Sequence, residues 1–307
     1  MDLISVIIST YNEPVEWVKK ALSSIIDQTY SNLEIIVVAD NPNNLPVLEY
    51  LRQVSLQKNI LLLENERNLG LVKSLNIALE HCTGDYIARM DADDISLPDR
   101  LEKQLQYLIR KKLDIVGTGF CDFIDEKKEI PRINPKTPAA CNRILKFRNC
   151  TLHPSWLMKR NVYEVLNGYR EIRACEDYDF LVRASISNFR IGNVPEMLVL
   201  YRNNPQSISH QNLGVQKAIM ERIAKEYRRN RVLSIDEYET YLKGKDIIND
   251  SKEIMDYYQV EEKLCSVGLV KRVLSIGKQM ILSNTYRREK LRNQYVKCMF
   301  IVDRMMG

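Results

Sequence analysis

The chain of 307 residues lacks the cysteine pairs of a zinc knuckle or a disulfide framework. Its seven Cys are an odd number, and no two of them are spaced as Cys-x-x-Cys. We therefore expect reduced and mostly buried thiols. With 11 Gly, 10 Pro, 28% charged and 45% apolar residues, the composition excludes disordered and collagen-like classes. The length fits one large domain or two modest domains.

Long apolar runs are also missing, since no stretch approaches the roughly 18 consecutive apolar residues that a membrane-spanning helix requires. Residues Met1 to Ser5 lack the basic region and cleavage site of a secretory signal, and the apolar run that follows ends at Thr10. We therefore expect a cytoplasmic protein, either free in the cytosol or peripheral on the inner face of the plasma membrane.

The positive charge is concentrated at the carboxyl end. The net charge is +5, yet from Glu261 onward ten Lys and Arg stand against four acidic residues, which leaves about −1 on the first 260 residues. A distributed footprint for nucleic acid is absent, so we expect no nucleic-acid partner.

Strand and helix patterns alternate from residue 3 to residue 90. Pro14 suits a first helical turn, with Asn12 or Glu13 near its cap. Such alternation predicts an α/β fold with a mostly parallel central sheet, buried on both faces by helices. The expected strands are 3–9, 33–39, 60–63 and 86–90, and the expected helices are 15–26, 45–56 and 71–79.

The second half is less regular. From about Leu113 the pattern loosens into strands and loops, and four prolines between 131 and 154 break any long helix. A helical run then opens at Glu176. Beyond residue 210, where we place a soft boundary, an α-helical extension is expected at 213–229, 235–243, 261–282 and 287–305.

Carboxylates gather after the predicted strands. In a parallel sheet, ligands bind beyond the carboxyl ends of the strands, here residues 10–13, Asp40, 64–70 and 91–94. These loops carry carboxylates, which suits a cation or a cationic partner, although exposed loops are often polar without one.

The motif Asp91-Ala92-Asp93-Asp94 gives the strongest local signal. Side chains at i and i+2 of a strand point the same way, so we expect Asp91 and Asp93 to face one ligand and Asp94 to face elsewhere. Two carboxylates without a neighbouring His or Cys cluster suit Mn²⁺ or Mg²⁺. The sequence contains no nucleophile elbow, Walker loop or dinucleotide fingerprint.

Several short motifs follow one another over residues 2–210. They are Thr10-Tyr11-Asn12-Glu13, Asp40, Asn68-Leu69-Gly70, Ser74-Leu75-Asn76, Arg89 to Asp94, Leu97-Pro98-Asp99-Arg100-Leu101, His153-Pro154-Ser155, Gly168-Tyr169-Arg170, Glu176-Asp177-Tyr178-Asp179 and Tyr201-Arg202. This ordered series resembles family 2 glycosyltransferases of the Rossmann-like GT-A fold, and within them bacterial capsule, O-antigen and lipooligosaccharide transferases.

The resemblance implies a GT-A catalytic domain at 1–210, with a nucleotide-sugar-binding half at 1–112 and an acceptor-binding half at 113–210, followed by a helical, basic region at 211–307. The donor would be a nucleotide sugar, expected to be a UDP-sugar. Its implied binding residues are Thr10, Tyr11 and Glu13 around the nucleoside, Asp40 on the base, Asp91 near the ribose, and Asn68, Gly70, Lys73, Arg89, Ala92 and Asp93.

Within that set, Asp93 would hold Mn²⁺ or Mg²⁺ on the diphosphate, with Asp91 as a second metal ligand. Lys73 and Arg89 are candidate phosphate contacts, and either could instead form a structural ion pair. For Tyr11, plain core packing is the alternative to nucleotide binding.

On the other side of the site, the resemblance makes Asp177 the catalytic base. Inversion in a single displacement needs a carboxylate that takes the proton of the acceptor hydroxyl. Glu176, His153 and Arg202 are placed on the acceptor or sugar side, although a lone His before Pro is more often structural. Asp179 would orient or cap.

Two positions depart from the family pattern. The usual Asp-Asp-Gly-Ser is replaced by Ala39-Asp40-Asn41-Pro42, and no His closely follows Tyr201-Arg202, because His210 is too far along the chain.

The expected activity is inverting, metal-dependent transfer of a hexosyl or N-acetylhexosaminyl group to a hydroxyl of a lipid-linked or oligosaccharide acceptor, in bacterial surface polysaccharide biosynthesis. The alternatives are a noncatalytic nucleotide-sugar-binding partner of another transferase, and a nucleotidyltransferase. In the tail, an apolar helical face at 264–281 lies beside Lys271 and Lys278. This pattern suits an anionic membrane surface, or else a helix packed on the catalytic domain.

Overall fold

The computed structural model describes residues 2–56, 59–124, 127–204, 213–244 and 287–297, together with 247, 251, 252, 276, 279 and 280. The first half alternates as expected, and every element lies within one residue of its expected bounds. The elements are β1 (Ile4–Thr10), α1 (Val15–Ile26), β2 (Leu33–Ala39), α2 (Leu45–Ser55), β3 (Ile60–Glu64), α3 (Leu71–Glu80) and β4 (Tyr86–Asp91).

The second half adds short strands and helices. They are β5 (Ile95–Ser96), α4 (Arg100–Lys111), β6 (Ile115–Ile124), β7 (Lys127–Arg132), α5 (Pro138–Leu145), the 3-10 turn η1 (His153–Ser155), β8 (Leu157–Lys159), α6 (Arg160–Leu166), α7 (Glu176–Ile186), β9 (Ile191–Arg202), α9 (Leu213–Arg228) and α10 (Ile235–Lys243).

One mixed sheet joins these strands in the order β3-β2-β1-β4-β8-β6-β9-β5, with β7 paired to β6. The strands β3, β2, β1 and β4 are parallel, and so is the pair of β6 and β9. β8 runs antiparallel to both β4 and β6, because the chain enters it from η1 rather than through a crossover helix. The α/β fold with a sheet between helices is therefore confirmed.

Alternation along each parallel strand builds two cores. In β1, Val6 and Ile8 pack with Leu22 of α1 and Leu101 of α4, whereas Ile7 packs with Leu75 of α3 on the other face. α2 packs on the same face of the sheet as α1 and α4, whereas α5, α6, α7 and α9 pack on the same face as α3. Because both faces are covered, the strands are apolar throughout.

No element was expected at residues 100–111, where α4 lies. Two polar residues on its buried face, Arg100 and Gln104, interrupt the apolar pattern. Gln104 Nε2 donates to the carbonyl oxygens of Val116 (3.0 Å) and Ser155 (2.7 Å), and Arg100 NH1 donates to Pro154 O (2.8 Å). These bonds connect α4 to η1. The two polar side chains therefore stabilise the packing of α4, although they interrupt the apolar pattern that would have predicted the helix.

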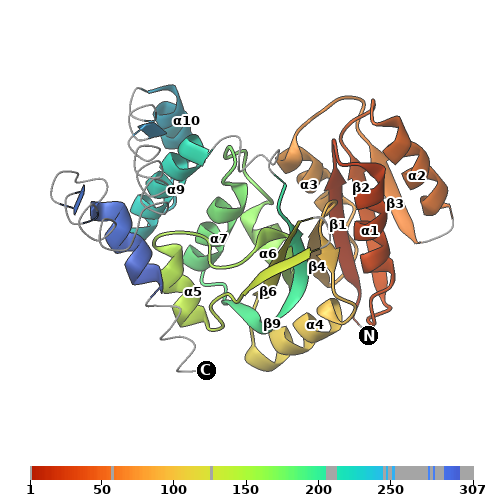
Figure 1. The fold of residues 1–307 in the computed structure, drawn as a ribbon, viewed down its shortest axis with the longest axis horizontal. Helices are drawn as coiled ribbons and strands as arrows, with labels where there is room; N and C mark the ends of the chain where they lie inside the picture. Colours follow the sequence, from red (N-terminus) through yellow and green to blue (C-terminus); the bar gives the residue numbers. More distant parts are fainter. Residues whose placement is uncertain are drawn as a thin grey trace.

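The carboxyl-terminal helices α9 and α10 lie at the end of the molecule opposite to α2 and β3 (Figure 1). α9 packs on α7 through one core that includes Ile219 and Phe180. The expected helices 213–229 and 235–243 are confirmed as α9 and α10. Residues 287–297 are helical, and the buried Val296 joins the same core. Most of the expected helix 261–282, the end of the expected helix 287–305, and His210 lie outside the described residues.

The five cysteines in the described part of the chain are buried thiols, as expected. Burial raises the pKa of the Cys82 thiol to about 12, so this group stays protonated. Within the same residues, no helix has both the length and the apolar character needed to cross a bilayer.

Candidate active site

A cavity of about 1330 Å³ lies at the carboxyl ends of β1, β2 and β4. All four loops predicted to meet there contribute to its wall, so their convergence is confirmed. Thr10 and Ala92 are buried and do not line the cavity. The other predicted site residues do: Tyr11, Glu13, Asp40, Asn68, Gly70, Lys73, Arg89, Asp91, Asp93, His153, Glu176, Asp177 and Arg202.

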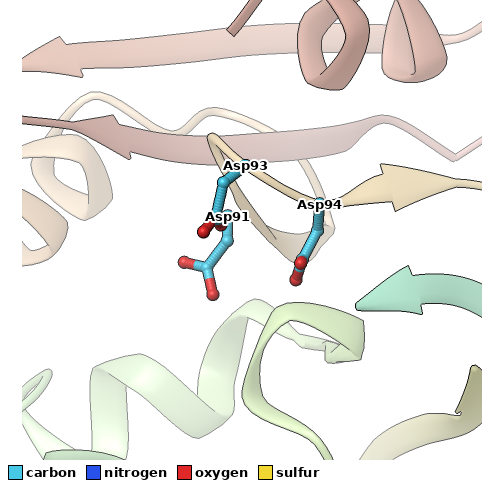
Figure 2. A group of neighbouring side chains, drawn as sticks. All are labelled: Asp91, Asp93 and Asp94. Atoms are coloured by element: carbon cyan, nitrogen blue, oxygen red, sulfur yellow. The ribbon is translucent and has the colours of Figure 1, made fainter. Parts of the chain in front are cut away.

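Three carboxylates converge at the turn after β4, as Figure 2 shows. One oxygen from each of Asp91, Asp93 and Asp94 lies within 4.8 Å of the others. The expectation that Asp94 faces elsewhere is therefore wrong. It assumed that strand alternation continues through residue 94, but β4 ends at Asp91 and a turn follows. Oδ1 of the fully buried Asp94 also accepts a hydrogen bond from the backbone N–H of Arg202 (2.7 Å).

Burial and mutual repulsion raise the pKa values of two carboxyl groups in this acidic turn. Burial, together with the charges of Asp91 and Glu13, raises the pKa of Asp93 to about 7. Burial and the charge of Asp93 raise the pKa of Asp94 well above its usual range. A cation would relieve both effects, and carboxylate oxygens are the ligands that Mn²⁺ and Mg²⁺ prefer. The donor set therefore fits such an ion.

Arg89 supplies a buried positive charge next to the acidic turn. Its side chain is only 2% exposed and forms an ion pair with Asp91. Its Nε and NH1 atoms have no hydrogen-bond partner in the described part of the chain. A buried guanidinium with unused donors has capacity for a further anionic partner.

The loop after β1 is organised by the carboxylate of Glu13. Its Oε2 accepts hydrogen bonds from Thr10 Oγ1 (2.7 Å) and from the backbone N–H of Tyr11 (2.6 Å). Pro14 is the N-cap residue of α1, so Glu13 lies next to the cap as expected, although no side chain caps the helix. Tyr11 is 42% exposed and lines the cavity, which argues against plain core packing of its ring.

Asp40 binds the loop that precedes α3. Its Oδ1 accepts from Asn65 Nδ2 (2.7 Å) and Leu69 N (2.8 Å), and its Oδ2 accepts from Gly70 N (2.8 Å). Asn68 Oδ1 also accepts from the Gly70 N–H (2.9 Å). Gly70 has a φ of +88°, which other residues adopt only at a cost, so this tight turn depends on glycine. Oδ2 of Asp40 keeps capacity for one more donor.

Glu176 and Asp177 face the cavity from the start of α7. Burial and the neighbouring Asp177 raise the pKa of Glu176 to about 8. Burial also raises the pKa of Asp177, although hydrogen bonds from Tyr178 N (2.6 Å) and Asn149 Nδ2 (2.6 Å) favour its charged form. The protein therefore stabilises the anionic form of Asp177 more than the anionic form of Glu176.

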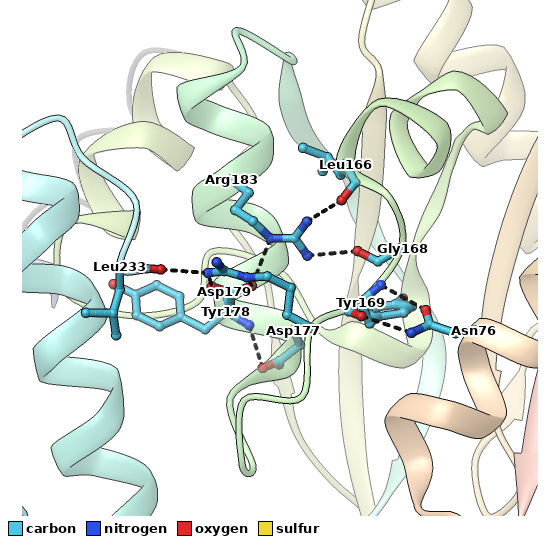
Figure 3. Close-up of polar contacts among 10 residues, drawn as sticks. Asn76, Leu166, Gly168, Tyr169, Asp177, Tyr178, Asp179, Arg183 and Leu233 are labelled. Carbon is cyan, nitrogen blue, oxygen red and sulfur yellow. Dashed lines mark hydrogen bonds and ion pairs between the residues drawn. The ribbon is translucent and has the colours of Figure 1, made fainter. Parts of the chain in front are cut away.

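Asp179 is structural, as expected for a residue that orients its neighbours. It is fully buried and forms ion pairs with Arg170 and Arg183. Arg183 donates to the carbonyl oxygens of Leu166 (2.7 Å) and Gly168 (2.9 Å), and Arg170 donates to Leu233 O (3.0 Å) (Figure 3). This network fixes the start of α7, and with it Glu176 and Asp177.

His153 lines the cavity from a buried position. Its Nε2 lies 2.9 Å from Tyr169 Oη, which lies 2.9 Å from Tyr163 Oη. Burial and the charge of Arg89 lower the pKa of His153 well below its usual range. The imidazole is therefore neutral near pH 7 and takes part in a hydrogen-bonded chain rather than in an ion pair.

The remaining predicted residues make contacts across the site. Lys73 Nζ lies 3.5 Å from Glu171 Oε1, an exposed pair of little energetic weight. Arg202 donates through Nε to Asp93 O (2.8 Å), and its guanidinium lies over the rings of Trp17 (4.4 Å) and Phe123 (4.3 Å). Arg202 thus holds the backbone of the acidic turn.

Two residues that shape the site were not predicted from the sequence. Asn149 holds Asp177, and Trp17 stacks on Arg202, but neither belongs to the recognised motifs. Trp17 gave a weak signal, because a large aromatic follows closely on the loop after the first strand. Asn149 gave none, because its contact with Asp177 depends on the fold of both loops.

The sequence model described as Glycosyl transferase family 2 matches residues 5–183. O-antigen biosynthesis glycosyltransferase WbnJ of Escherichia coli is 32% identical over 216 residues, 70% of this chain and 85% of that protein. S. aureus TarS 1-349 in complex with UDP-GlcNAc has a TM-score of 0.62 at 18% identity, over 98% of this chain and 89% of that chain. The mannosyltransferase PcManGT of Pyrobaculum calidifontis, in complex with GDP-Man and Mn2+, has a TM-score of 0.57 at 18% identity, over 98% and 87%. At such identities these two structures show likeness of fold.

Proposed function

The chain belongs to glycosyl transferase family 2, and we propose that it transfers a sugar, with inversion and with a divalent metal, from a UDP-sugar to a hydroxyl group of its acceptor. The observation that carries this proposal is the arrangement of acids in one cavity. The acidic turn and the pair Glu176 and Asp177 belong to different halves of the chain, yet they line the same space. Arg89 lowers the pKa of acids in both groups.

The donor would lie at the ends of β1, β2 and β4. Tyr11 and Glu13 would contact the nucleoside, Asp40 the base through its remaining acceptor capacity, and Asp91 the ribose. Asn68, Gly70, Lys73 and Arg89 would complete the binding of the diphosphate sugar, while Thr10 and Ala92 would act through the backbone geometry of their loops. The complex of TarS with UDP-GlcNAc supports a uridine donor. Because PcManGT is in complex with GDP-Man, the test includes donors with different bases.

Asp93 and Asp91 would hold the Mn²⁺ or Mg²⁺ ion, with Asp94 beside them. Such an ion neutralises the charge that develops on the departing diphosphate. The protein holds the three carboxylates close together. Arg202 contributes by donating hydrogen bonds to Asp93 O and Asp94 Oδ1.

The base would be Asp177. Its carboxylate would accept the proton of the acceptor hydroxyl as the hydroxyl oxygen attacks the anomeric carbon from the face opposite the diphosphate. Asn149 and the backbone of Tyr178 stabilise the anionic form that this step requires. The carboxyl group of Glu176, whose pKa is about 8, would hold a proton near neutral pH and donate a hydrogen bond to the sugar or acceptor.

The acceptor would be lipid-linked or an oligosaccharide, and the transferred group a hexosyl or N-acetylhexosaminyl residue. The role of WbnJ in O-antigen biosynthesis supports a place in bacterial surface polysaccharide biosynthesis. We also propose a cytoplasmic protein whose basic carboxyl-terminal region contacts the inner face of the plasma membrane. In this proposal residues 1–112 bind the donor, 113–210 bind the acceptor, and 211–307 form the helical extension.

A panel of nucleotide sugars, with hydrolysis and calorimetric binding as readouts, tests the proposal. We expect one donor to bind and to be hydrolysed slowly in the presence of Mn²⁺ or Mg²⁺, and chelation to abolish hydrolysis. Asp93→Ala should lose the metal-dependent hydrolysis, and full activity of this variant in excess chelator would contradict the metal assignment. Binding without hydrolysis or transfer would indicate a noncatalytic partner. Release of pyrophosphate from a nucleoside triphosphate would indicate nucleotidyl transfer.

A further inference from the structure

His153, Tyr169 and Tyr163 form a buried hydrogen-bond network that ends at the wall of the cavity. All three side chains are buried, and of the three only His153 lines the cavity. We propose that Tyr169 donates a hydrogen bond to Nε2 of His153, which leaves the imidazole proton on Nδ1, and that this Nδ1–H binds an oxygen of the transferred sugar. The inference rests on the proposed function and specifies how the site holds the sugar.

The direction of the hydrogen bonds follows from Tyr163, at the inner end of the network. Its hydroxyl oxygen lies 2.9 Å from Tyr169 Oη, which is its one hydrogen-bond partner within the described residues. A buried O–H without an acceptor is costly, so Tyr163 donates to Tyr169. Tyr169 then donates its own proton to His153 Nε2, which lies 2.9 Å from its hydroxyl oxygen. The opposite direction would leave the Tyr163 O–H without an acceptor.

The hydrogen bond from Tyr169 decides the tautomer of His153. Burial and the charge of Arg89 lower the pKa of His153 well below its usual range, so the ring is neutral. A ring nitrogen that accepts a hydrogen bond carries no proton, and the proton of a neutral ring then lies on the other nitrogen. His153 therefore has one N–H donor, at Nδ1.

Nδ1 of His153 is open to the cavity. It makes no hydrogen bond within the part of the chain that the structure describes. It is also not one of the fully enclosed side-chain atoms that lack a partner there. Because His153 lines the cavity, a ligand in the cavity can reach the Nδ1–H.

Ring packing and backbone contacts hold the network in place. The ring of His153 lies 4.5 Å from the ring of Trp156, centroid to centroid. The ring of Tyr169 lies 5.0 Å from that of Phe180. Asn76 also holds the backbone of Tyr169, because its Nδ2 donates to Tyr169 O (2.9 Å) and its Oδ1 accepts from Tyr169 N (2.9 Å) (Figure 3). The Nδ1–H is therefore oriented before a ligand binds, which lowers the entropic cost of binding.

The network lies between the acidic turn and α7. The backbone N–H of Arg89 donates to Trp156 O (2.9 Å), which joins the segment after η1 to β4 and so to the acidic turn. Arg170, next to Tyr169 in the chain, forms an ion pair with Asp179 of α7. In the proposed function the transferred sugar lies between the diphosphate at the acidic turn and the base on α7. A neutral N–H at this place suits an uncharged hydroxyl oxygen of that sugar.

Long-range proton–nitrogen NMR spectra of the imidazole rings test the tautomer in the protein without ligands. The chain contains three His, and the variants His81→Asn and His210→Asn identify the other two sets of signals. We expect the wild-type proton of His153 on Nδ1. A wild-type proton on Nε2 would overturn the inference, and this result needs no change in the buried network.

Two hydroxyl deletions test the role of Tyr169 as a positioning residue. Tyr169→Phe should shift the Nε2 signal of His153, because Nε2 loses the hydrogen bond that it accepts. Tyr163→Phe is the matched control, since it removes a hydroxyl from the same network while Tyr169 can still donate to Nε2. An Nε2 signal that Tyr169→Phe leaves unchanged would contradict this role.

Two substitutions of His153 test the contact with the sugar. The side-chain NH₂ of Asn lies near the place of Nδ1, and that of Gln lies near the place of Nε2, so only His153→Asn can still donate into the cavity. Binding is measured by calorimetry with Mg²⁺ and two pairs of probes, UDP with UDP-GlcNAc and GDP with GDP-mannose. For the pair that binds the wild type, His153→Gln should weaken the sugar nucleotide about tenfold, the loss of one hydrogen bond, and His153→Asn should weaken it less. The nucleoside diphosphate should bind all three proteins equally, and so should both probes in the control His81→Asn, an exposed position outside the cavity.

Equal weakening of the sugar nucleotide by His153→Asn and His153→Gln would contradict donation from Nδ1. Equal weakening of the nucleoside diphosphate and the sugar nucleotide would contradict contact with the sugar. The proposed function is scored separately. If none of the four nucleotides binds the wild type, the donor assignment is rejected and the sugar contact with it, while the NMR spectra still decide the tautomer. Binding of a sugar nucleotide with the proton of His153 on Nε2 would retain the proposed function and reject only this inference.

Discussion

The side-chain amide of Asn149 lies 2.6 Å from Oδ2 of Asp177 and donates a hydrogen bond to it. Oδ1 of the same carboxylate accepts from the backbone N–H of Tyr178 (2.6 Å). These two bonds fix the plane of the carboxylate and leave each oxygen with one further lone pair. An acceptor hydroxyl in the cavity can therefore donate to an anion that is already oriented.

Replacing Asp177 by Asn should separate transfer from donor binding. The amide has nearly the same shape but cannot take the hydroxyl proton, so transfer should fall by roughly 10² to 10⁴. Donor affinity, measured by calorimetry, should stay near that of the wild type. Glu176→Gln provides the comparison. If Asp177→Asn keeps near-normal transfer while Glu176→Gln abolishes it, then Glu176 is the base.

Glu176 should make stability depend on pH. Its pKa in the folded protein is about 8 instead of 4.5, because of burial and the charge of Asp177. Between these two pH values the folded protein holds a proton that the unfolded chain has lost, so stability falls as the pH rises through this window. Glu176→Gln should therefore lose less stability than the wild type between pH 5 and pH 8 in thermal melts. Glu164→Gln, at an exposed site on α6, should follow the wild type, and parallel curves for all three proteins would refute the assignment.

Asp40→Asn should destabilise the loop before α3. Asp40 accepts hydrogen bonds from Leu69 N and Gly70 N through different oxygens, and an asparagine can offer an acceptor to only one of them. The loss of one charge-assisted hydrogen bond from a partly buried N–H costs about 1–3 kcal/mol, measurable by urea unfolding. Donor affinity should fall as well, since Asn68 and Gly70 line the cavity. Asp27→Asn, at an exposed position after α1, is the matched control, and an equal loss in both variants would count against the role given to Asp40.

Membrane contact is a prediction from the sequence of the tail, at positions that lie outside the described residues. The triple variant Lys271→Gln, Arg272→Gln and Lys278→Gln should float less with anionic liposomes than the wild type. Each basic group near the surface contributes on the order of 1 kcal/mol, and the difference should shrink as salt rises. The triple variant Arg110→Gln, Lys111→Gln and Lys112→Gln, at the end of α4 and its C-cap, removes the same charge elsewhere. Equal flotation of both variants and the wild type would contradict the prediction.

Local patterns predicted the first half of the fold because its strands are short, apolar and separated by amphipathic helices. The same patterns failed where distant residues decide the structure. Alternation along β4 predicted that Asp94 points away, but a turn and the backbone of Arg202 bring its carboxylate back to the site. The direction of β8 follows from η1, whose position depends on Arg100 and Gln104 in the core. Asp40 was recognised, but its partners lie 25 to 30 residues further along the chain.

The bond between Arg202 and Asp94 bears on how this enzyme can be assembled. The two residues are 108 positions apart in the chain. The acidic turn therefore lacks the hydrogen bond from Arg202 until the last residue of β9 has been synthesised. Contacts between positions so far apart form late, because the chain entropy of closing the loop opposes them. The two ends of the cavity are therefore one cooperative folding unit. If the amino-terminal half alone were exchanged between related enzymes, its donor site would depend on an arginine at the matching position of the other half to hold its acids together.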